Sequence, residues 1–119
     1  MQLEEIRNYC FKKKVVTEDF PFDEETLVFK VFGKLFLLTN INDEEISVNL
    51  KCEPALAIEL REKYESVKPG YHMNKKHWNT VKYTGEFSEK EFYKMIDHSY
   101  EQVVKSMSKK IQEELKNCE

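Results

Sequence analysis

The sequence predicts an α+β fold in which helices pack on an antiparallel β-sheet. Between residues 26 and 51, three runs suited to strands are joined by connections too short for a crossover helix, so these strands must be antiparallel. Runs with the apolar spacing of helices precede and follow them. At 119 residues the chain is long enough to bury a core, and we expect one domain over residues 1–119.

The first part of the chain predicts a helix and then an extended segment. Apolar residues at helical spacing predict the helix over residues 2–13, with three lysines, residues 12–14, at its C-terminal end, where cations suit the helix dipole. Residues 15–22 are expected to be extended. We expect the rings of Phe20 and Phe22 to cover an open edge of the core.

The meander follows in the next thirty residues. Residues 27–31 and 34–41 predict two strands, joined at Phe32-Gly33 by a tight hairpin turn. Alternation of apolar and polar residues from 46 to 51 predicts a third strand with one face in water.

The second half predicts a helix, a hairpin and two more helices. Pro54 suits the first turn of a helix that reaches about residue 64, with either Ile58 or Ala57 on its buried side. Two strands are expected near residues 68–72 and 78–84, joined by a loop at 74–77.

The last two helices have clear starting signals. Ser88 and Glu91 have the spacing of a capping box and open a long helix with an apolar stripe that ends at Met107. A short helix is expected over residues 109–116.

Composition limits the function classes. The net charge of −3 means that the whole molecule does not attract nucleic acid, so any such binding depends on a local patch. The chain has no apolar run of membrane-spanning length and no signal-peptide pattern at its start, so we expect a cytoplasmic protein without a membrane partner. Three widely spaced cysteines predict reduced thiols. We expect a monomer without a cofactor.

Residues 66–85 form the most informative segment. It contains no acidic residue, although acids outnumber bases in the chain, and it carries four lysines, two of the three histidines and the only tryptophan. Such a gathering of cations, amides and aromatic rings indicates an interaction surface for an anionic partner.

Four segments match a known family: residues 69–78 (Pro-Gly-Tyr-His-Met-Asn-Lys-Lys-His-Trp), 19–22, 48–52 and 97–100. Through them the chain resembles the YjbR/MmcQ-like family of small bacterial proteins, over roughly residues 3–115. The resemblance implies a compact fold similar to that of frataxin (CyaY)-like proteins. It also implies double-stranded DNA binding through paired β-hairpin wings.

The hairpin from Tyr71 to Lys82 is the predicted binding site. Contacts to phosphate are expected from the tip residues Asn74, Lys75 and Lys76, for which the alternative is a plain solvated turn. The remaining predicted site residues would widen the basic face (His72, His77, Lys51 and Lys82) or stack on a base (Trp78 and Tyr71).

Structural alternatives compete with these roles. A large aromatic residue on a short strand is more often part of the core, so we expect Trp78 to point inward and His77 outward. Lys51 and Asn49 share one face of their strand, which can simply be a wet sheet face.

The rival function is a non-catalytic domain that binds a small ligand or a protein and uses the same cluster as a polar pocket. Trp78 and His72 discriminate the two, because side chains spread along a ridge favour a duplex, whereas side chains that converge in a cleft favour a small molecule. If DNA binds, acids in residues 18–25 and 43–45 direct it to the opposite side.

We predict neither a catalytic nor a metal site. Residues 97–100 (Asp-His-Ser-Tyr) contain the residue types of a triad, but consecutive helical residues point in different directions and cannot converge. His72 and His77 lack the spacing of a zinc motif.

Overall fold

In the computed structural model, which describes residues 1–118, six strands form one sheet in the order β1-β2-β3-β4-β6-β5, with every neighbouring pair antiparallel. The strands are β1 (Val16–Asp19), β2 (Thr26–Val31), β3 (Lys34–Asn40), β4 (Ser47–Lys51), β5 (Val67–Pro69) and β6 (Trp78–Lys82). The helices are α1 (Leu3–Phe11), α2 (Pro54–Lys63), α3 (Glu89–Lys105) and α4 (Lys109–Asn117).

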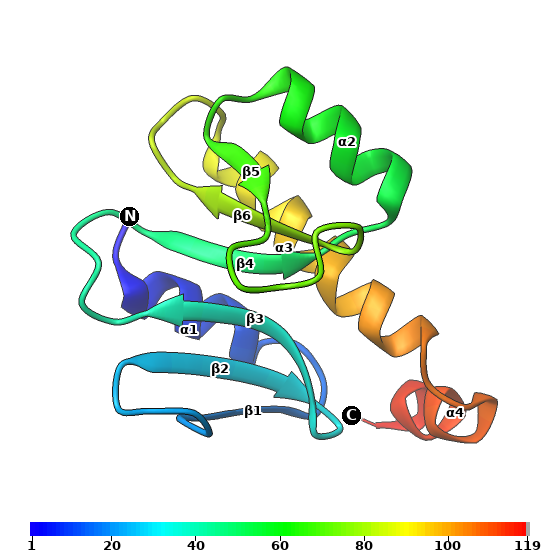
Figure 1. Cartoon of the computed structure of the whole chain (residues 1–119). Helices are drawn as coiled ribbons and strands as arrows, with labels where there is room; N and C mark the ends of the chain where they lie inside the picture. The colour runs from blue at the N-terminus through cyan, green and yellow to red at the C-terminus, as the bar shows by residue number, and fades with distance from the viewer. Residues whose placement is uncertain (119) are drawn as a thin grey trace.

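The helices leave one face of the sheet open. Figure 1 shows α1 and α3 behind the sheet, α2 beside β5, and α4 beyond the end of α3. We call the side without α1 and α3 the open face. The α+β prediction is confirmed. Within residues 1–118, no helix is both long enough and apolar enough to cross a membrane.

The core lies between the sheet and the helices α1 and α3. Its largest fully buried side chains include Phe29 and Phe36 from the sheet, Ile6 from α1, and Phe92 and Ile96 from α3. Because successive strand residues alternate between faces, this side of the sheet is apolar and the other side carries most of the polar residues of β4 and β6.

The meander has four strands rather than the three predicted. β1 pairs with β2 from Val16 opposite Val31 to Asp19 opposite Val28. Its residues alternate only between half-buried and exposed positions, because it is an edge strand, and the apolar pattern is correspondingly weak. The predicted hairpin turn is confirmed, with φ of 48° at Phe32 and 78° at Gly33.

The predicted role of Phe20 and Phe22 is wrong. Their side chains are 45% and 65% exposed and do not cover the core. Past the edge strand, the chain turns at Asp23, whose Oδ1 accepts hydrogen bonds from the backbone N–H groups of Glu25 and Thr26. This turn keeps the segment at the rim of the sheet.

The first helix is shorter than predicted, and the lysine run follows it instead of ending it. Lys13 pairs with Asp97 of α3, and its Nζ lies 5.1 Å from the centre of the Tyr9 ring. Lys13 thus lies beyond the helix and contacts α3 together with Tyr9, whose hydroxyl also bonds Asp97.

The later helices follow the predicted pattern closely. The Ser88 Oγ accepts a hydrogen bond from the Glu91 N–H at 3.1 Å, which confirms the start of α3. On α2, Ala57 is buried and Ile58 is 54% exposed, which settles the alternative left open by the sequence.

Candidate functional site

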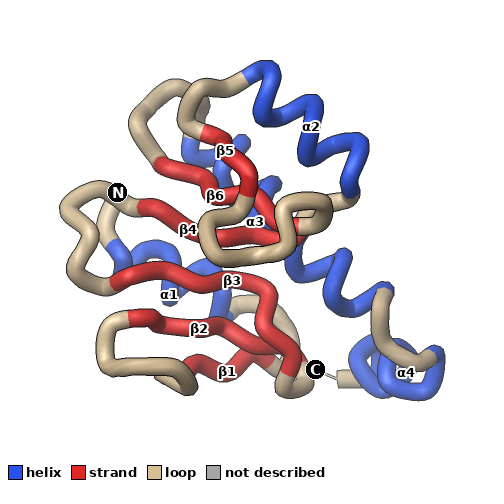
Figure 2. The backbone as a smooth tube through the Cα atoms, viewed as in Figure 1, coloured by secondary structure: helices blue, strands red, loops and turns tan. Residues whose placement is uncertain are grey.

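The β5–β6 loop (residues 70–77) turns back over the open face instead of extending β5. Strand β5 ends at Pro69, so the prediction of a strand to residue 72 is wrong. The Gly70 N–H still bonds the Trp78 carbonyl at 2.9 Å, but the Tyr71 N–H bonds the Thr80 Oγ1, and His72 takes a left-handed φ of 58°. Figure 2 shows the loop crossing in front of β4.

Gly70 allows the chain to turn back because its backbone lies close against Trp78 of β6. A Cβ at Gly70 would lie 2.8 Å from the Trp78 Cβ and 3.0 Å from the Trp78 carbonyl oxygen. No side chain fits there without moving the backbone of β6. The glycine therefore sets how closely the loop packs on the strand.

Asn74 organises the tip of the loop from inside. Its Oδ1 accepts hydrogen bonds from the backbone N–H groups of Lys76 at 2.9 Å and His77 at 3.3 Å, and its carbonyl accepts one from Trp78 at 2.9 Å. The side-chain oxygen is used within the turn, in the manner of an Asx-turn. Asn74 thus orders the backbone that carries Lys75 and Lys76.

Arg61 of α2 holds the loop from outside. Its Nε donates to the Asn79 Oδ1 at 2.7 Å, and its Nη2 donates to the carbonyls of Trp78, at 3.2 Å, and Lys75. Sequence reasoning missed Arg61, because the only local signal was a cation on the helix before the hairpin. The contact joins three segments that are far apart along the chain.

Five lysines of this loop and of the strands β4, β5 and β6 form what we call the basic surface. By strand register, Lys51, Lys68 and Lys82 lie on the same face as Asn49 and Thr80, the open face. The basic surface consists of Lys51, Lys68, Lys75, Lys76 and Lys82.

Most of these lysines lack an acidic partner. Lys82 lies 4.0 Å from Glu45. The other four have no ion pair with any residue in 1–118, and the Lys75 Nζ donates only to the Gly70 carbonyl, at 3.2 Å. Lys75 and Lys76 are exposed, and Lys51 is half-buried.

Trp78 is not part of the core, contrary to expectation. It lies opposite Lys51 in the register, and the residues that β6 turns toward the helices are Asn79 and Val81. The indole is half-buried on the open face beside Gly70. His77 is half-buried too, and its carbonyl accepts a hydrogen bond from the Cys52 N–H at 2.7 Å.

A groove of about 510 Å³ runs over the open face between two loops. We call it the open-face groove. Tyr71, His72 and Met73 line it from the β5–β6 loop, and Phe22 lines it from the loop before β2. The Tyr71 and His72 rings lie 4.0 Å apart between centroids. Its remaining lining comes mainly from β3 and β4 and includes Leu35, Leu38, Asn40, Ser47 and Asn49. Asp43 of the β3–β4 loop and Thr80 of β6 also line it.

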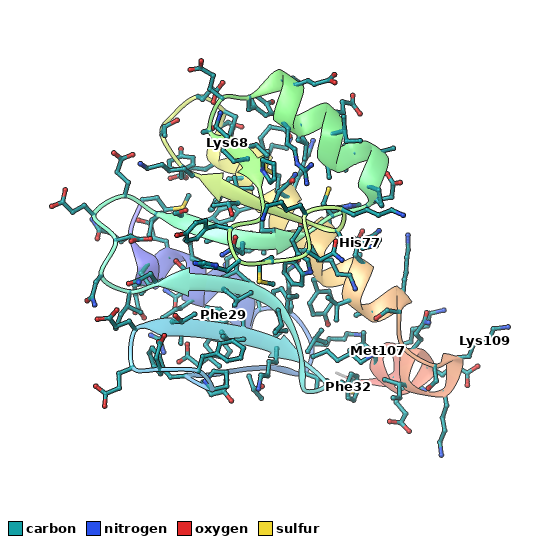
Figure 3. The ribbon with its side chains drawn as sticks, in the orientation of Figure 1. Phe29, Phe32, Lys68, His77, Met107 and Lys109 are labelled. Carbon is teal, nitrogen blue, oxygen red and sulfur yellow. The ribbon has the colours of Figure 1, made fainter. Side chains whose placement is uncertain are left out.

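The predicted site residues therefore separate into two groups. Tyr71 and His72 converge in the open-face groove, whereas Lys75, Lys76, His77 and Trp78 do not line it. Figure 3 shows Lys68 and His77 beside the strands β4, β5 and β6, and Lys109 on α4, beyond the end of α3.

The side chains of residues 97–100 serve the fold. Each holds a different segment. Asp97 accepts a hydrogen bond from the Tyr9 hydroxyl at 2.7 Å, and the His98 Nε2 accepts one from the Glu53 N–H at 3.1 Å. The Ser99 Oγ accepts from the Lys51 N–H at 2.8 Å and donates to the Phe36 carbonyl, while the Tyr100 hydroxyl donates to the Lys14 carbonyl at 2.7 Å. Partial burial of the imidazole lowers the pKa of His98.

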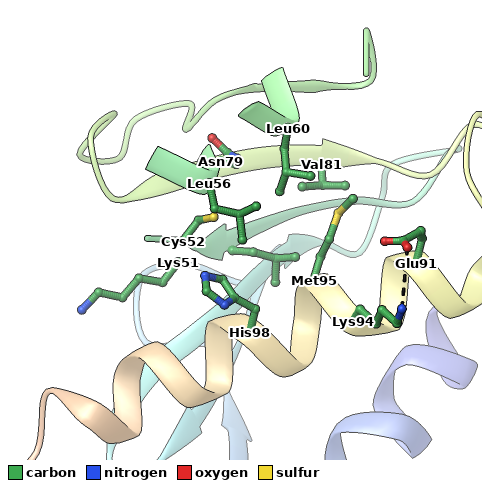
Figure 4. A pocket seen from close by; sticks show the side chains of 11 residues that line it. Lys51, Cys52, Leu56, Leu60, Asn79, Val81, Glu91, Lys94, Met95 and His98 are labelled. Carbon is green, nitrogen blue, oxygen red and sulfur yellow. Dashed lines mark ion pairs between the residues drawn. The ribbon is translucent and has the colours of Figure 1, made fainter. Parts of the chain in front are cut away.

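A second pocket lies on the helical side of the sheet, between α2 and α3 (Figure 4). Its volume is about 220 Å³, and its walls are mostly apolar, including Leu56, Leu60 and Met95. Of the predicted site residues only Lys51 borders it. Across the described chain, residues 1–118, no three His, Cys, Asp or Glu side chains are arranged to hold a metal ion.

Comparisons with known proteins give one consistent result. The model of the YjbR family matches residues 11–102. The chain is 38% identical to the Escherichia coli O157:H7 protein YbdF over 96 residues (81% of this chain and 79% of that protein) and 33% identical to the Escherichia coli K12 protein YjbR over 104 residues (87% and 88%). A crystal structure of a Deinococcus radiodurans protein with the domain DUF419 superposes with a TM-score of 0.90 at 37% identity, covering 96% of this chain and 87% of that one. A Pseudomonas syringae crystal structure gives 0.69 at 30% identity, with 83% and 96% covered.

Proposed function

The chain belongs to the YjbR family, and from its basic surface we propose that it is a non-catalytic nucleic-acid-binding protein. One observation carries the proposal. Lys75 and Lys76 are exposed on a loop whose backbone is fixed by Asn74 and Arg61, so two cations extend from an ordered backbone. A loop that is already ordered loses little backbone entropy when its side chains meet phosphate.

The charge distribution supports one orientation of the partner. The basic surface occupies the half of the sheet formed by β4, β6 and β5. The acids of residues 18–25 lie at the other end, in β1 and the loop after it, and those of residues 43–45 lie in the β3–β4 loop, where Glu45 is 4.0 Å from Lys82. A polyanion that crossed the whole sheet would meet these acids. The nucleic acid therefore follows the β5–β6 loop and stays on the basic half.

Residues 97–100, which contain the residue types of a triad, support a non-catalytic function. Asp97, His98, Ser99 and Tyr100 each contact a separate structural partner. None of these four groups is arranged to activate another, as nucleophilic catalysis requires.

The test is a titration of labelled nucleic acid followed by fluorescence anisotropy at several salt concentrations. Lys75→Ala/Lys76→Ala is compared with Lys109→Ala/Lys110→Ala, which removes the same charge from exposed lysines at the far end of the molecule. For a duplex, each lost phosphate contact lowers the slope of log affinity against log salt by about 0.9. We expect a loss of about 1.8 for the first variant and none for the second.

Two results would overturn the proposal. One is the absence of saturable binding at low salt. The other is equal weakening by both double variants, which would mean that net charge alone matters and that the β5–β6 loop has no special role.

A second candidate function is the binding of a small free ligand in the open-face groove. The observation in its favour is that Tyr71 and His72 converge there rather than spreading along a ridge. A mononucleotide that binds as tightly as an oligonucleotide would favour this candidate over the first.

A further inference from the structure

Resting on the proposed function, we propose that the open-face groove receives one unpaired base, so that the protein binds single-stranded nucleic acid in preference to duplex. The groove and the basic surface share the β5–β6 loop: Tyr71 and His72 line the groove, and Lys75 and Lys76 follow on the same loop. A strand held at these lysines can therefore turn one base inward.

Two exposed aromatic rings border the groove from different loops. Tyr71 is 71% exposed and Phe22 is 65% exposed, and both line the groove. The Tyr71 backbone is held by its N–H bond to the Thr80 Oγ1, and the Tyr71 ring lies against the His72 ring. Exposed aromatic rings are the platforms on which proteins stack unpaired bases.

Polar groups between the rings offer unused donors. The Asn49 Oδ1 accepts the Thr80 hydroxyl, and its Nδ2 has no partner among the residues that the structure describes. The Asn40 Oδ1 likewise accepts the Asn42 N–H, at 2.8 Å, and leaves its amide group available. Amide donors match the carbonyl and ring-nitrogen acceptors of a base edge, which a duplex already uses in pairing.

The size of the groove suits a base with its sugar. An apolar cavity of about 150 Å³ is sufficient for benzene, and the open-face groove has about 510 Å³. A base in a duplex would reach it only after extrusion from the stack, at a cost of a few kcal/mol. An unpaired base avoids most of that cost.

The acids near the groove determine which end of a nucleotide enters. Asp43 lines the groove, and Asp23 follows Phe22 directly in sequence. Their carboxylates repel a phosphate but leave a neutral base unaffected. The phosphate therefore remains at the basic surface, and only the base reaches toward Phe22.

The test compares three labelled oligonucleotides by anisotropy: a single strand, its duplex, and the same strand with abasic sites. Phe22→Ala and Tyr71→Ala each remove one ring from the groove, and Phe20→Ala is the matched control, an exposed ring of the same loop that does not line the groove. We expect the single strand to bind most tightly and each groove variant to weaken it at least about fivefold. None of the three substitutions is expected to change the affinity for the duplex or for the abasic strand.

The outcomes separate this inference from the proposed function. Equal affinity for all three oligonucleotides, unaffected by Phe22→Ala and Tyr71→Ala, overturns the inference and leaves binding by the basic surface intact. Binding of none of them overturns both. Equal weakening by Phe20→Ala and Phe22→Ala also overturns the inference. All three positions are exposed, so we expect the variants to remain folded. Circular dichroism melts check this expectation.

Discussion

At the scale of single residues, several polar side chains of the candidate region are structural in role. Arg61 and His98 bond backbone groups of segments distant in sequence, and Asn74 bonds backbone groups within its own turn. Such bonds are worth about 1 kcal/mol each when made and cost more when one partner is lost. The polar residues around the site therefore include both those that hold it and those that face the partner.

His98 gives a pH dependence that can be measured. Its Nε2 accepts the Glu53 N–H, and partial burial lowers its pKa below the ordinary value of 6.5, with smaller effects from Glu101, Lys105 and Glu53. Because the unfolded chain then binds more protons than the folded one, the free energy of unfolding falls as pH drops through about 6.5. It levels off below the pKa of the folded state.

Urea unfolding at about pH 7.5 and about pH 5.5 checks this prediction. Wild type is expected to lose stability on acidification, and His98→Gln is expected to lose less. His72→Gln should behave like wild type, since it leaves the bond between His98 and Glu53 in place. An identical loss in wild type and His98→Gln would show that other groups cause the effect.

At the scale of elements, the β5–β6 loop is the feature that depends most on distant contacts. Arg61 bonds the backbone of Lys75 and Trp78 and the side chain of Asn79. Arg61→Ala leaves these acceptors without their partner, and we expect it to destabilise the fold by about 1–3 kcal/mol.

The loss of Arg61 should also weaken nucleic-acid binding, because the two lysines of the loop are then less fixed. Urea unfolding and anisotropy of the same samples measure both effects. Lys63→Ala is the control. It removes an exposed cation of the same helix and its cation–π contact with Tyr64, and it should change stability by less than about 1 kcal/mol. If Arg61→Ala and Lys63→Ala behave alike, the hydrogen bonds of Arg61 to the loop contribute to neither stability nor nucleic-acid binding.

The elements themselves were largely predictable from the sequence. The turn at Phe32-Gly33 and the start of α3 at Ser88 depend on local chemistry, which a sequence displays directly. Strand β1 was recognised only as extended, since an edge strand has no fully buried face. The end of β5 at Pro69 was missed because Gly70 and Arg61 fix it through tertiary contacts.

At the scale of the whole molecule, the sheet carries opposite charges at its two ends. The basic surface lies over β4, β6 and β5, the acids of residues 18–25 lie at the β1 and β2 end, and those of residues 43–45 lie in the β3–β4 loop, at the margin of the basic surface. This arrangement allows a protein of net charge −3 to meet a polyanion through one half of one face.

The composition of the site was only half predictable. The lysines of the hairpin lie close together in sequence, so their cluster could be predicted from the sequence. The open-face groove was not, because Phe22, Asn49 and Tyr71 come from three separated segments that only the strand order brings together. Trp78 was misplaced because alternation along a strand fixes which residues share a face but not which face is buried.

One measurement tests the central claim most directly: a map of backbone amide chemical shifts in the protein as a single-stranded oligonucleotide is added. The account predicts that shifts concentrate in residues 47–51 and 68–82 and extend to the groove residues Phe22 and Asn40, with little change in α4. Shifts centred on α4, or no saturable shifts at low salt, would contradict it.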